Sequence, residues 1–163
     1  MVKRWIWIMA AMLMLSGCAA QETYETVMDV WQEQDSPAPR AILVDLPGES
    51  ALPVMESDGG RAYVASGYEI YIQTMPSGEL GATVEAMSGY PQEALTVMSI
   101  FQEDVMRHEF VWAAAGEGGD LLGRGIILDD GHHHYTMTVL RNADTAEKSP
   151  VVWDSVFSSF RLA

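Results

Sequence analysis

The chain has 163 residues and a formal net charge of −14, with 23 acidic side chains against nine basic ones. Nucleic-acid binding needs clustered Lys and Arg side chains, so this balance argues against it. It also argues against electrostatic docking on anionic lipid. The only cysteine, Cys18, leaves no partner for a disulfide within the chain.

The first 17 residues have the features of a bacterial export signal. Lys3 and Arg4 precede an apolar run over residues 6–15, which has the length of a signal-peptide core and is too short to cross a bilayer. The sequence Leu15-Ser16-Gly17-Cys18 then resembles the lipobox of bacterial lipoproteins, in which an apolar residue and two small ones precede a lipidated cysteine. The alternatives are an ordinary secretory signal and an N-terminal membrane helix.

The lipobox resemblance implies cleavage before Cys18 and attachment of diacylglycerol to its sulfur. The protein would then be held by lipid on the extracytoplasmic side of a membrane of the cell envelope. Residues 1–17 contain two of the basic residues and none of the acidic ones, so the cleaved chain would carry a charge of −16. The lipid on Cys18 would therefore supply the membrane attachment.

Residues 18–39 are expected to form a tether between this lipid and the folded domain. The tether contains one stripe of a short amphipathic helix, because four apolar residues fall at positions i, i+3, i+4 and i+7: Tyr24, Val27, Met28 and Trp31. We expect this helix to pack on the domain, since its polar face is acidic and interfacial helices favour Lys and Arg. Pro37 and Pro39 end the tether, and residues 40–163 are predicted to form a single domain.

The first half of this domain has the two-residue periodicity of strands. Strands are expected over residues 40–46, 52–56, 61–65 and 68–73. In the last of them, residues 68, 70 and 72 should be buried and residues 69, 71 and 73 partly exposed. A helix should follow over residues 79–87, with Ser77 as its N-cap and Gly89 beyond its C-terminus, and then a helical turn over residues 91–94.

The second half contains one ambiguous stretch and one clear hairpin. Residues 95–115 fit either one long helix or two strands, and their β-branched and aromatic residues favour strands over 95–101 and 105–115. Residues 121–129 and 132–141 should form a hairpin around Asp130-Gly131. The last helix should begin at Ser149-Pro150 and bury one face, made of Val152, Trp153, Val156, Phe157 and Phe160.

These elements predict an α+β domain with a mainly antiparallel sheet, a central helix, and a C-terminal amphipathic helix packed on the sheet. The element order and the closing helix, Trp153-Asp154-Ser155-Val156-Phe157-Ser158-Ser159-Phe160, resemble the PsbP-like α/β/α sandwich. This resemblance is topological and implies a fold, without a function.

The strongest concentration of possible metal ligands is His132-His133-His134. On a strand, His132 and His134 share one face. A two-residue turn at Asp130-Gly131 would pair Asp129 with His132, so two imidazoles and a carboxylate could form a site for zinc, copper or nickel. The alternative is a polar hairpin end that binds nothing.

Other motifs of catalysis are missing from the sequence. The stretch that begins His108-Glu109 has Trp112 where a zinc-protease motif needs its second histidine, and no serine lies in a nucleophile-elbow frame. We therefore nominate no catalytic residue and no cofactor apart from a possible divalent metal. The sequence favours a non-enzymatic envelope lipoprotein that binds a protein or small molecule, and a metal-binding lipoprotein is the alternative.

Overall fold

The computed structural model describes residues 37–48, 52–65, 67–116, 119–143 and 150–163, without the side chains of residues 150–153. The predicted export signal, Cys18 and the helix over residues 24–31 lie outside this part. No helix among the described residues is long and apolar enough to cross a membrane.

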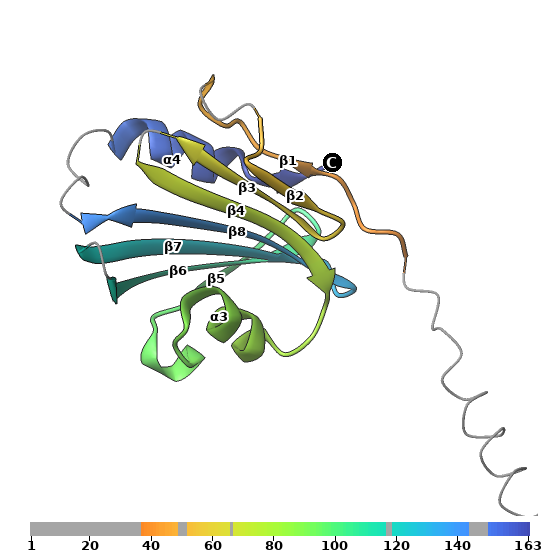
Figure 1. Ribbon diagram of the computed structural model, residues 1–163. Helices are drawn as coiled ribbons and strands as arrows, with labels where there is room; N and C mark the ends of the chain where they lie inside the picture. The colour runs from red at the N-terminus through yellow and green to blue at the C-terminus, as the bar shows by residue number, and fades with distance from the viewer. Residues whose placement is uncertain (1–36, 49–51, 66, 117–118, 144–149) are drawn as a thin grey trace, which may run out of the picture. The chain divides into compact units, whose positions relative to one another are not determined.

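A seven-stranded antiparallel sheet forms the centre of the domain (Figure 1). Its strand order is β2-β3-β4-β8-β7-β6-β5, so every strand pairs with a neighbour in sequence except at the β4–β8 junction. The strands are β2 (Met55–Ser57), β3 (Gly60–Ala65), β4 (Tyr68–Pro76), β5 (Met98–Gln102), β6 (Val105–Gly116), β7 (Gly119–Asp129) and β8 (His133–Asn142). The expected α+β class with a mainly antiparallel sheet is confirmed.

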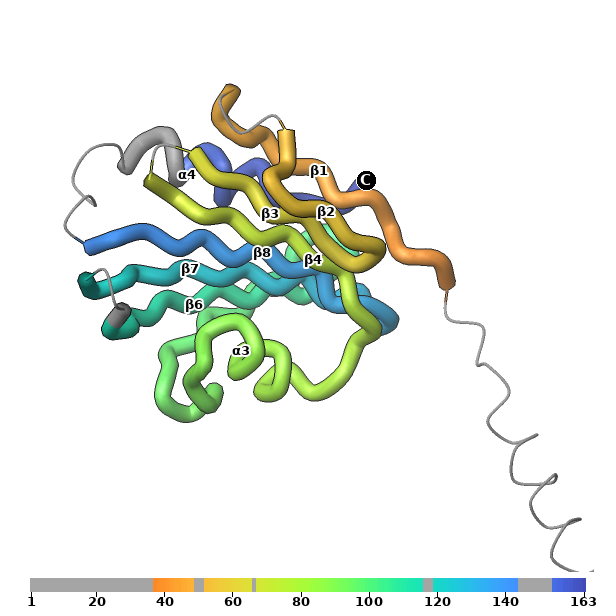
Figure 2. Tube along the Cα trace, in the orientation of Figure 1, coloured from red at the N-terminus to blue at the C-terminus, as the bar shows by residue number. Residues whose placement is uncertain are grey.

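One helix covers each face of this sheet (Figure 2). The helix α3 (Leu80–Ser88) and the 3-10 turn η3 (Gln92–Ala94) lie on one face. The helix α4 (Pro150–Ser159) lies on the other, together with the short pair β1 (Ile42–Leu43) and β9 (Arg161–Leu162). The chain is thus layered as helix, sheet and helix.

Alternating side chains of the central strands supply both core layers, as the period of a strand requires. On β7, Ile126 and Leu128 pack toward α4, whereas Ile127 packs toward α3. The α4 layer also takes the buried helix residues Val156 and Phe157. Residues 38–163 form one compact unit that contains both layers, so this part of the chain has the core it needs to fold alone.

Several predicted elements are confirmed. The stretch 95–115 forms the two strands β5 and β6, and α3 ends at Gly89, whose positive φ of 77° places it in the left-handed region. On β4, Tyr68, Ile70 and Ile72 are buried and the residues between them are exposed. The last helix begins at Pro150, while the proposed cap Ser149 lies outside the described residues.

The predicted register of the β7–β8 hairpin is wrong by two residues. Asp129 pairs with His134, where the sequence suggested His132. The reason is the side chain of Asp130, which accepts hydrogen bonds from the backbone N–H groups of His132 and His133 at 2.9 and 2.7 Å. This Asx-type turn moves the apex to Gly131 and His132.

The predicted cap of α3 is also wrong. The N-cap position is Glu79, which makes no side-chain capping bond. Ser77 instead donates a hydrogen bond to Asp129 Oδ1 at 3.3 Å and lies at the same distance from His134 Nε2. The Ser77 side chain therefore bonds residues of the sheet and does not cap the N-terminus of α3.

Candidate functional site

A pocket of about 610 Å³ lies between α4 and the sheet. We call it the α4 pocket, and it is lined by Tyr68, Val111, Trp112, Ala113, Leu122, Gly123, Arg124, Val139, Arg141, Asp154 and Phe157. Its volume falls within the range of small-molecule sites, which is roughly 300 to 1,000 Å³. Two other hollows have volumes of about 370 and 360 Å³.

The floor of the α4 pocket is a patch on four adjacent strands. Arg141 on β8 pairs with Tyr68 on β4 and with Leu122 on β7. Arg124 on β7 pairs with Val139 on β8 and with Val111 on β6. Because paired residues share a face of the sheet, each arginine lies between apolar neighbours on this floor.

The roof of the pocket comes from α4. The guanidinium carbon of Arg124 lies 4.0 Å from the centre of the Phe157 ring, which is a cation–π contact. Arg124 also bonds Asp154 Oδ1 at 3.4 Å. Asp154 keeps 76% of its side-chain surface exposed, so this ion pair is weak.

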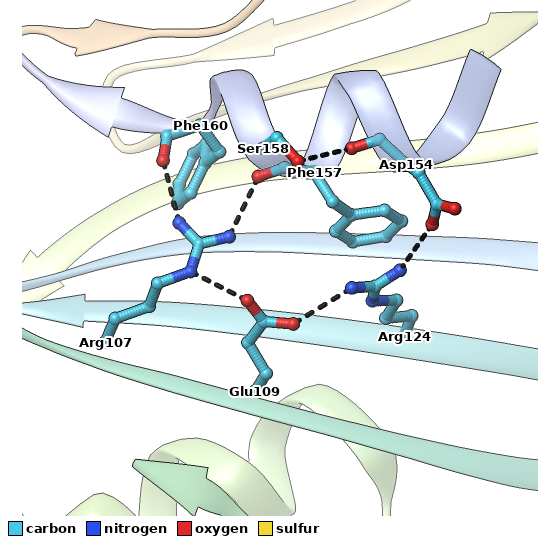
Figure 3. Close-up of polar contacts among 7 residues, drawn as sticks. All are labelled: Arg107, Glu109, Arg124, Asp154, Phe157, Ser158 and Phe160. Atoms are coloured by element: carbon cyan, nitrogen blue, oxygen red, sulfur yellow. Dashed lines mark hydrogen bonds and ion pairs between the residues drawn. The ribbon is translucent and has the colours of Figure 1, made fainter. Parts of the chain in front are cut away.

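Glu109 on β6 holds the other side of Arg124 (Figure 3). Its two carboxylate oxygens accept hydrogen bonds from Arg124 at 2.9 Å and from Arg107 at 2.7 Å. Burial alone would raise the pKa of Glu109, but the hydrogen bonds and charges of the two arginines outweigh it and hold the pKa below its usual value. Glu109 is therefore ionised and fixes both guanidinium groups.

Arg107 connects this network to the end of α4. Its two terminal nitrogens donate to the backbone carbonyls of Phe160 and Phe157 at 2.9 and 2.8 Å (Figure 3). The last carbonyls of a helix have no partner within the helix and carry its negative dipole end, so a guanidinium is a suitable cap. The network thus joins β6, β7 and α4 around the pocket.

The predicted metal ligands lie on the opposite face of the sheet, and the structure brings two of the three together. Asp129 and His134 are paired across the strands, with 3.7 Å between Oδ2 and Nε2. His132 lies in the turn and is exposed. Within the described ranges, no three ligand-type side chains are placed to hold a metal ion.

His134 has protein partners at both ring nitrogens. Nδ1 lies 2.8 Å from the Thr83 hydroxyl on α3, and Nε2 lies 3.3 Å from the Ser77 hydroxyl. Only 1% of the residue is exposed. These bonds satisfy a buried imidazole and attach α3 to the sheet.

His108 on β6 is a second buried histidine on the α3 face of the sheet. It lies near Asp129 and His134 because β6 pairs with β7. Its Nδ1 lies 2.8 Å from the Ser99 hydroxyl on β5. Burial lowers the pKa of His108, and the charge of His134 lowers it further, while Asp129 acts in the opposite sense. His108 is therefore a neutral partner of Ser99 at pH 7.

No protein family matches this chain, and no curated protein matches it. The candidate site therefore depends on the geometry of the chain itself.

Sequence reasoning missed the α4 pocket and its arginines, although one signal was present. Arg124 stands inside an otherwise apolar strand, Leu121-Leu122-Gly123-Arg124-Gly125-Ile126-Ile127. A charge on a partly buried strand needs a partner or a ligand. Glu109, two residues after Arg107 on the neighbouring strand, is that partner.

Proposed function

We propose that this protein is a lipid-anchored, non-enzymatic binding module of the bacterial cell envelope. Diacylglycerol on Cys18 holds it to a membrane, and the domain of residues 38–163 works on the extracytoplasmic side. The observation that carries the proposal is Leu15-Ser16-Gly17-Cys18 directly after a charged start and an apolar run. The α4 pocket supports the binding role, since it combines an apolar floor with a few polar groups.

The anchor is tested by labelling cells with palmitate and separating their membranes. The natural chain should take up label and sediment with the membrane fraction, and Cys18→Ala should lose both properties. Gly17→Ala is the matched control, because it keeps a small residue before the cysteine and should stay labelled. A Cys18→Ala protein that still takes up palmitate would refute the anchor.

Metal binding is the second candidate function, and the close pair of Asp129 and His134 favours it. It stands second because His134 is buried and bonded at both ring nitrogens. Calorimetric titration of zinc and copper into residues 38–163 decides between this metal-binding function and the binding module proposed first. Tight stoichiometric binding that disappears in His132→Ala/His134→Ala would place the metal function first.

A further inference from the structure

We propose that the outer edge of β5 pairs with β5 of a second copy of this chain, and that each copy inserts its Met98 into a hollow beside β5 of the other. This is the hollow of about 370 Å³, which we call the β5 hollow, and Ile100 and Gln102 are among its lining residues. The inference goes beyond the binding role proposed above. It depends neither on the lipid anchor nor on the α4 pocket.

The two edges of the seven-stranded sheet are protected unequally. At one edge, β2 has only three residues, follows Pro53 closely and carries Glu56, which is paired with Arg61 at 2.8 Å. Short length, charge and proline are features that keep a sheet edge from pairing with another chain. At the other edge, β5 has five residues without a charge, Met98-Ser99-Ile100-Phe101-Gln102 (Figure 1).

The strand β5 is open to solvent along its whole length. All five residues are exposed, and Met98, Ile100 and Phe101 keep 60, 63 and 67% of their surface. Among the described residues the strand pairs with β6 alone, so the backbone groups of its outer edge have no strand partner there. Such an edge, with apolar side chains beside it, is a template for one more strand.

The sequence of β5 is suited to pairing with itself. In an antiparallel pairing centred on Ile100, this residue lies opposite Ile100 of the second copy, Met98 lies opposite Gln102, and Ser99 lies opposite Phe101. All five residues are then matched, and no charged side chain faces another. The same pairing centred on Ser99 or Phe101 matches only three of the five.

The contact between Met98 and the β5 hollow follows from this register. Met98 and Ile100 pair with Glu109 and Arg107 of β6, so they lie on the α4 side of the sheet. Gln102 lies on the same side, because it follows Ile100 by two residues, and it lines the hollow. Met98 of the second copy lies opposite Gln102, and its flexible side chain can fill the hollow. The two-fold symmetry of the pairing repeats this contact.

The charges around the β5 hollow favour a second copy over a strongly charged partner. Asp104 is paired with Arg40 at 2.8 Å, and Glu109 with Arg107 at 2.7 Å. The chain as a whole carries −14, so two copies repel each other least where acidic side chains are balanced by basic ones. The charged residues that line the hollow are balanced in this way: Arg40, Arg107, Arg161, Glu103, Asp104 and Glu109.

Sedimentation equilibrium of residues 38–163 tests the dimer. Two short strands make a small interface, so we expect a dissociation constant of roughly 10 to 100 µM, with the average mass rising from one chain to two. A chain that stays monomeric up to about 1 mM would overturn the proposal. Assemblies larger than two chains would overturn the two-fold pairing.

Met98→Ala and its matched control Met55→Ala make the same change at the two edges of the sheet, at side chains that are 60 and 69% exposed. Met98→Ala should weaken the dimer about tenfold, because it removes the side chain that fills the hollow. Met55→Ala on β2 should leave the dimer unchanged. Equal effects of the two changes, or no effect of Met98→Ala, would overturn the contact with the hollow.

Single cysteines test the register, because the only cysteine of the chain, Cys18, lies outside residues 38–163. Ile100→Cys places two sulfur atoms opposite each other on the symmetry axis, within reach of a disulfide. Met98→Cys places its two cysteines roughly 13 Å apart along the paired strands. We expect oxidation above the dissociation constant to cross-link Ile100→Cys and not Met98→Cys. Cross-linking of both to the same extent, or of neither, would contradict the register.

The alternative occupant of the β5 edge is the segment of the same chain before residue 38. Sedimentation of residues 19–163 distinguishes it from a second copy, and we expect the same dimer. A dimer of residues 38–163 that is absent for residues 19–163 would show that this segment covers the edge, and would overturn the second copy. Neither result bears on the palmitate labelling of Cys18, which tests the proposed function separately.

Discussion

Glu109 illustrates how a carboxylate can lie partly buried between a sheet and a helix. Its side chain is 21% exposed and is bonded by Arg107 and Arg124. Removing one member of such a network leaves the other charges without partners, which costs more than the bonds themselves contribute. The residue therefore stabilises the attachment of α4 as well as the position of Arg124.

We expect Glu109→Gln to lower the free energy of unfolding by about 2 to 4 kcal/mol, measured by urea denaturation. The matched control is Glu56→Gln, which removes the exposed pair between Glu56 and Arg61 at 2.8 Å and should change stability little. Equal losses in the two variants would show that the network around Glu109 has no special role.

Two of the ionisable groups with a lowered pKa, Glu109 and His108, predict separate losses of stability in acid. The pKa of Glu109 lies below 4.5 in the folded chain, so its contribution is present above pH 4.5 and is lost as the pH falls through the folded value. The pKa of His108 lies below 6.5, so the unfolded chain takes up a proton first as the pH falls below 6.5. The loss of stability due to His108 therefore occurs at a higher pH than the loss due to Glu109.

His108→Gln should therefore reduce the fall in unfolding free energy between pH 7 and pH 5. Urea denaturation at both pH values measures it, and Ser99 supplies a partner that a glutamine side chain can still bond. An unchanged slope in this variant would contradict the role of His108 in this pH range.

At the scale of elements, β7 is shaped by two glycines that receive aromatic rings. Phe110 and Trp112 on β6 pair with Gly125 and Gly123, and the two rings stack with 5.4 Å between their centroids. A Cβ atom at either glycine would meet the ring of its partner. A glycine inside a strand lowers the stability of the sheet. Here the two glycines leave space for the rings of Phe110 and Trp112 in the core on the α3 face.

Gly123→Ala should accordingly destabilise the fold by about 1 to 3 kcal/mol, because Trp112 must leave its place. Thermal unfolding and the near-ultraviolet circular dichroism of Trp112 report the change. Gly78→Ala is the control, since nothing lies within 4 Å of a Cβ atom there. A well-folded Gly123→Ala with the tryptophan signal unchanged would contradict this packing.

The sequence predicts the strands and helices well, because the spacing of apolar residues and the positions of turn-forming residues such as Gly and Pro are local properties. The α+β class, the strand pair after residue 95 and the end of α3 at Gly89 all follow from them. The hairpin register does not, because the side chain of Asp130 bonds the backbone of its own turn and moves the apex. The role of Ser77 does not either, because its partners Asp129 and His134 lie far along the chain. The α4 pocket was missed for the same reason, since its residues come from five elements far apart in the chain.

The whole chain divides into two parts. The residues before Pro37 contain the proposed export signal and the proposed lipidation site, Cys18. Residues 38–163 contain the layered fold and the α4 pocket. The acidic charge is consistent with the proposed attachment, in which lipid on Cys18 is the only contact with the membrane. Of the two parts, the anchor is the central claim, because it decides where the domain meets its ligand.

Mass spectrometry of the N-terminal peptide, taken from protein extracted from bacterial membranes, tests that claim most directly. We predict a peptide that begins at Cys18 and carries diacylglycerol on the cysteine sulfur. A peptide that contains an unmodified Cys18, or a mature chain that begins at any other residue, would contradict it.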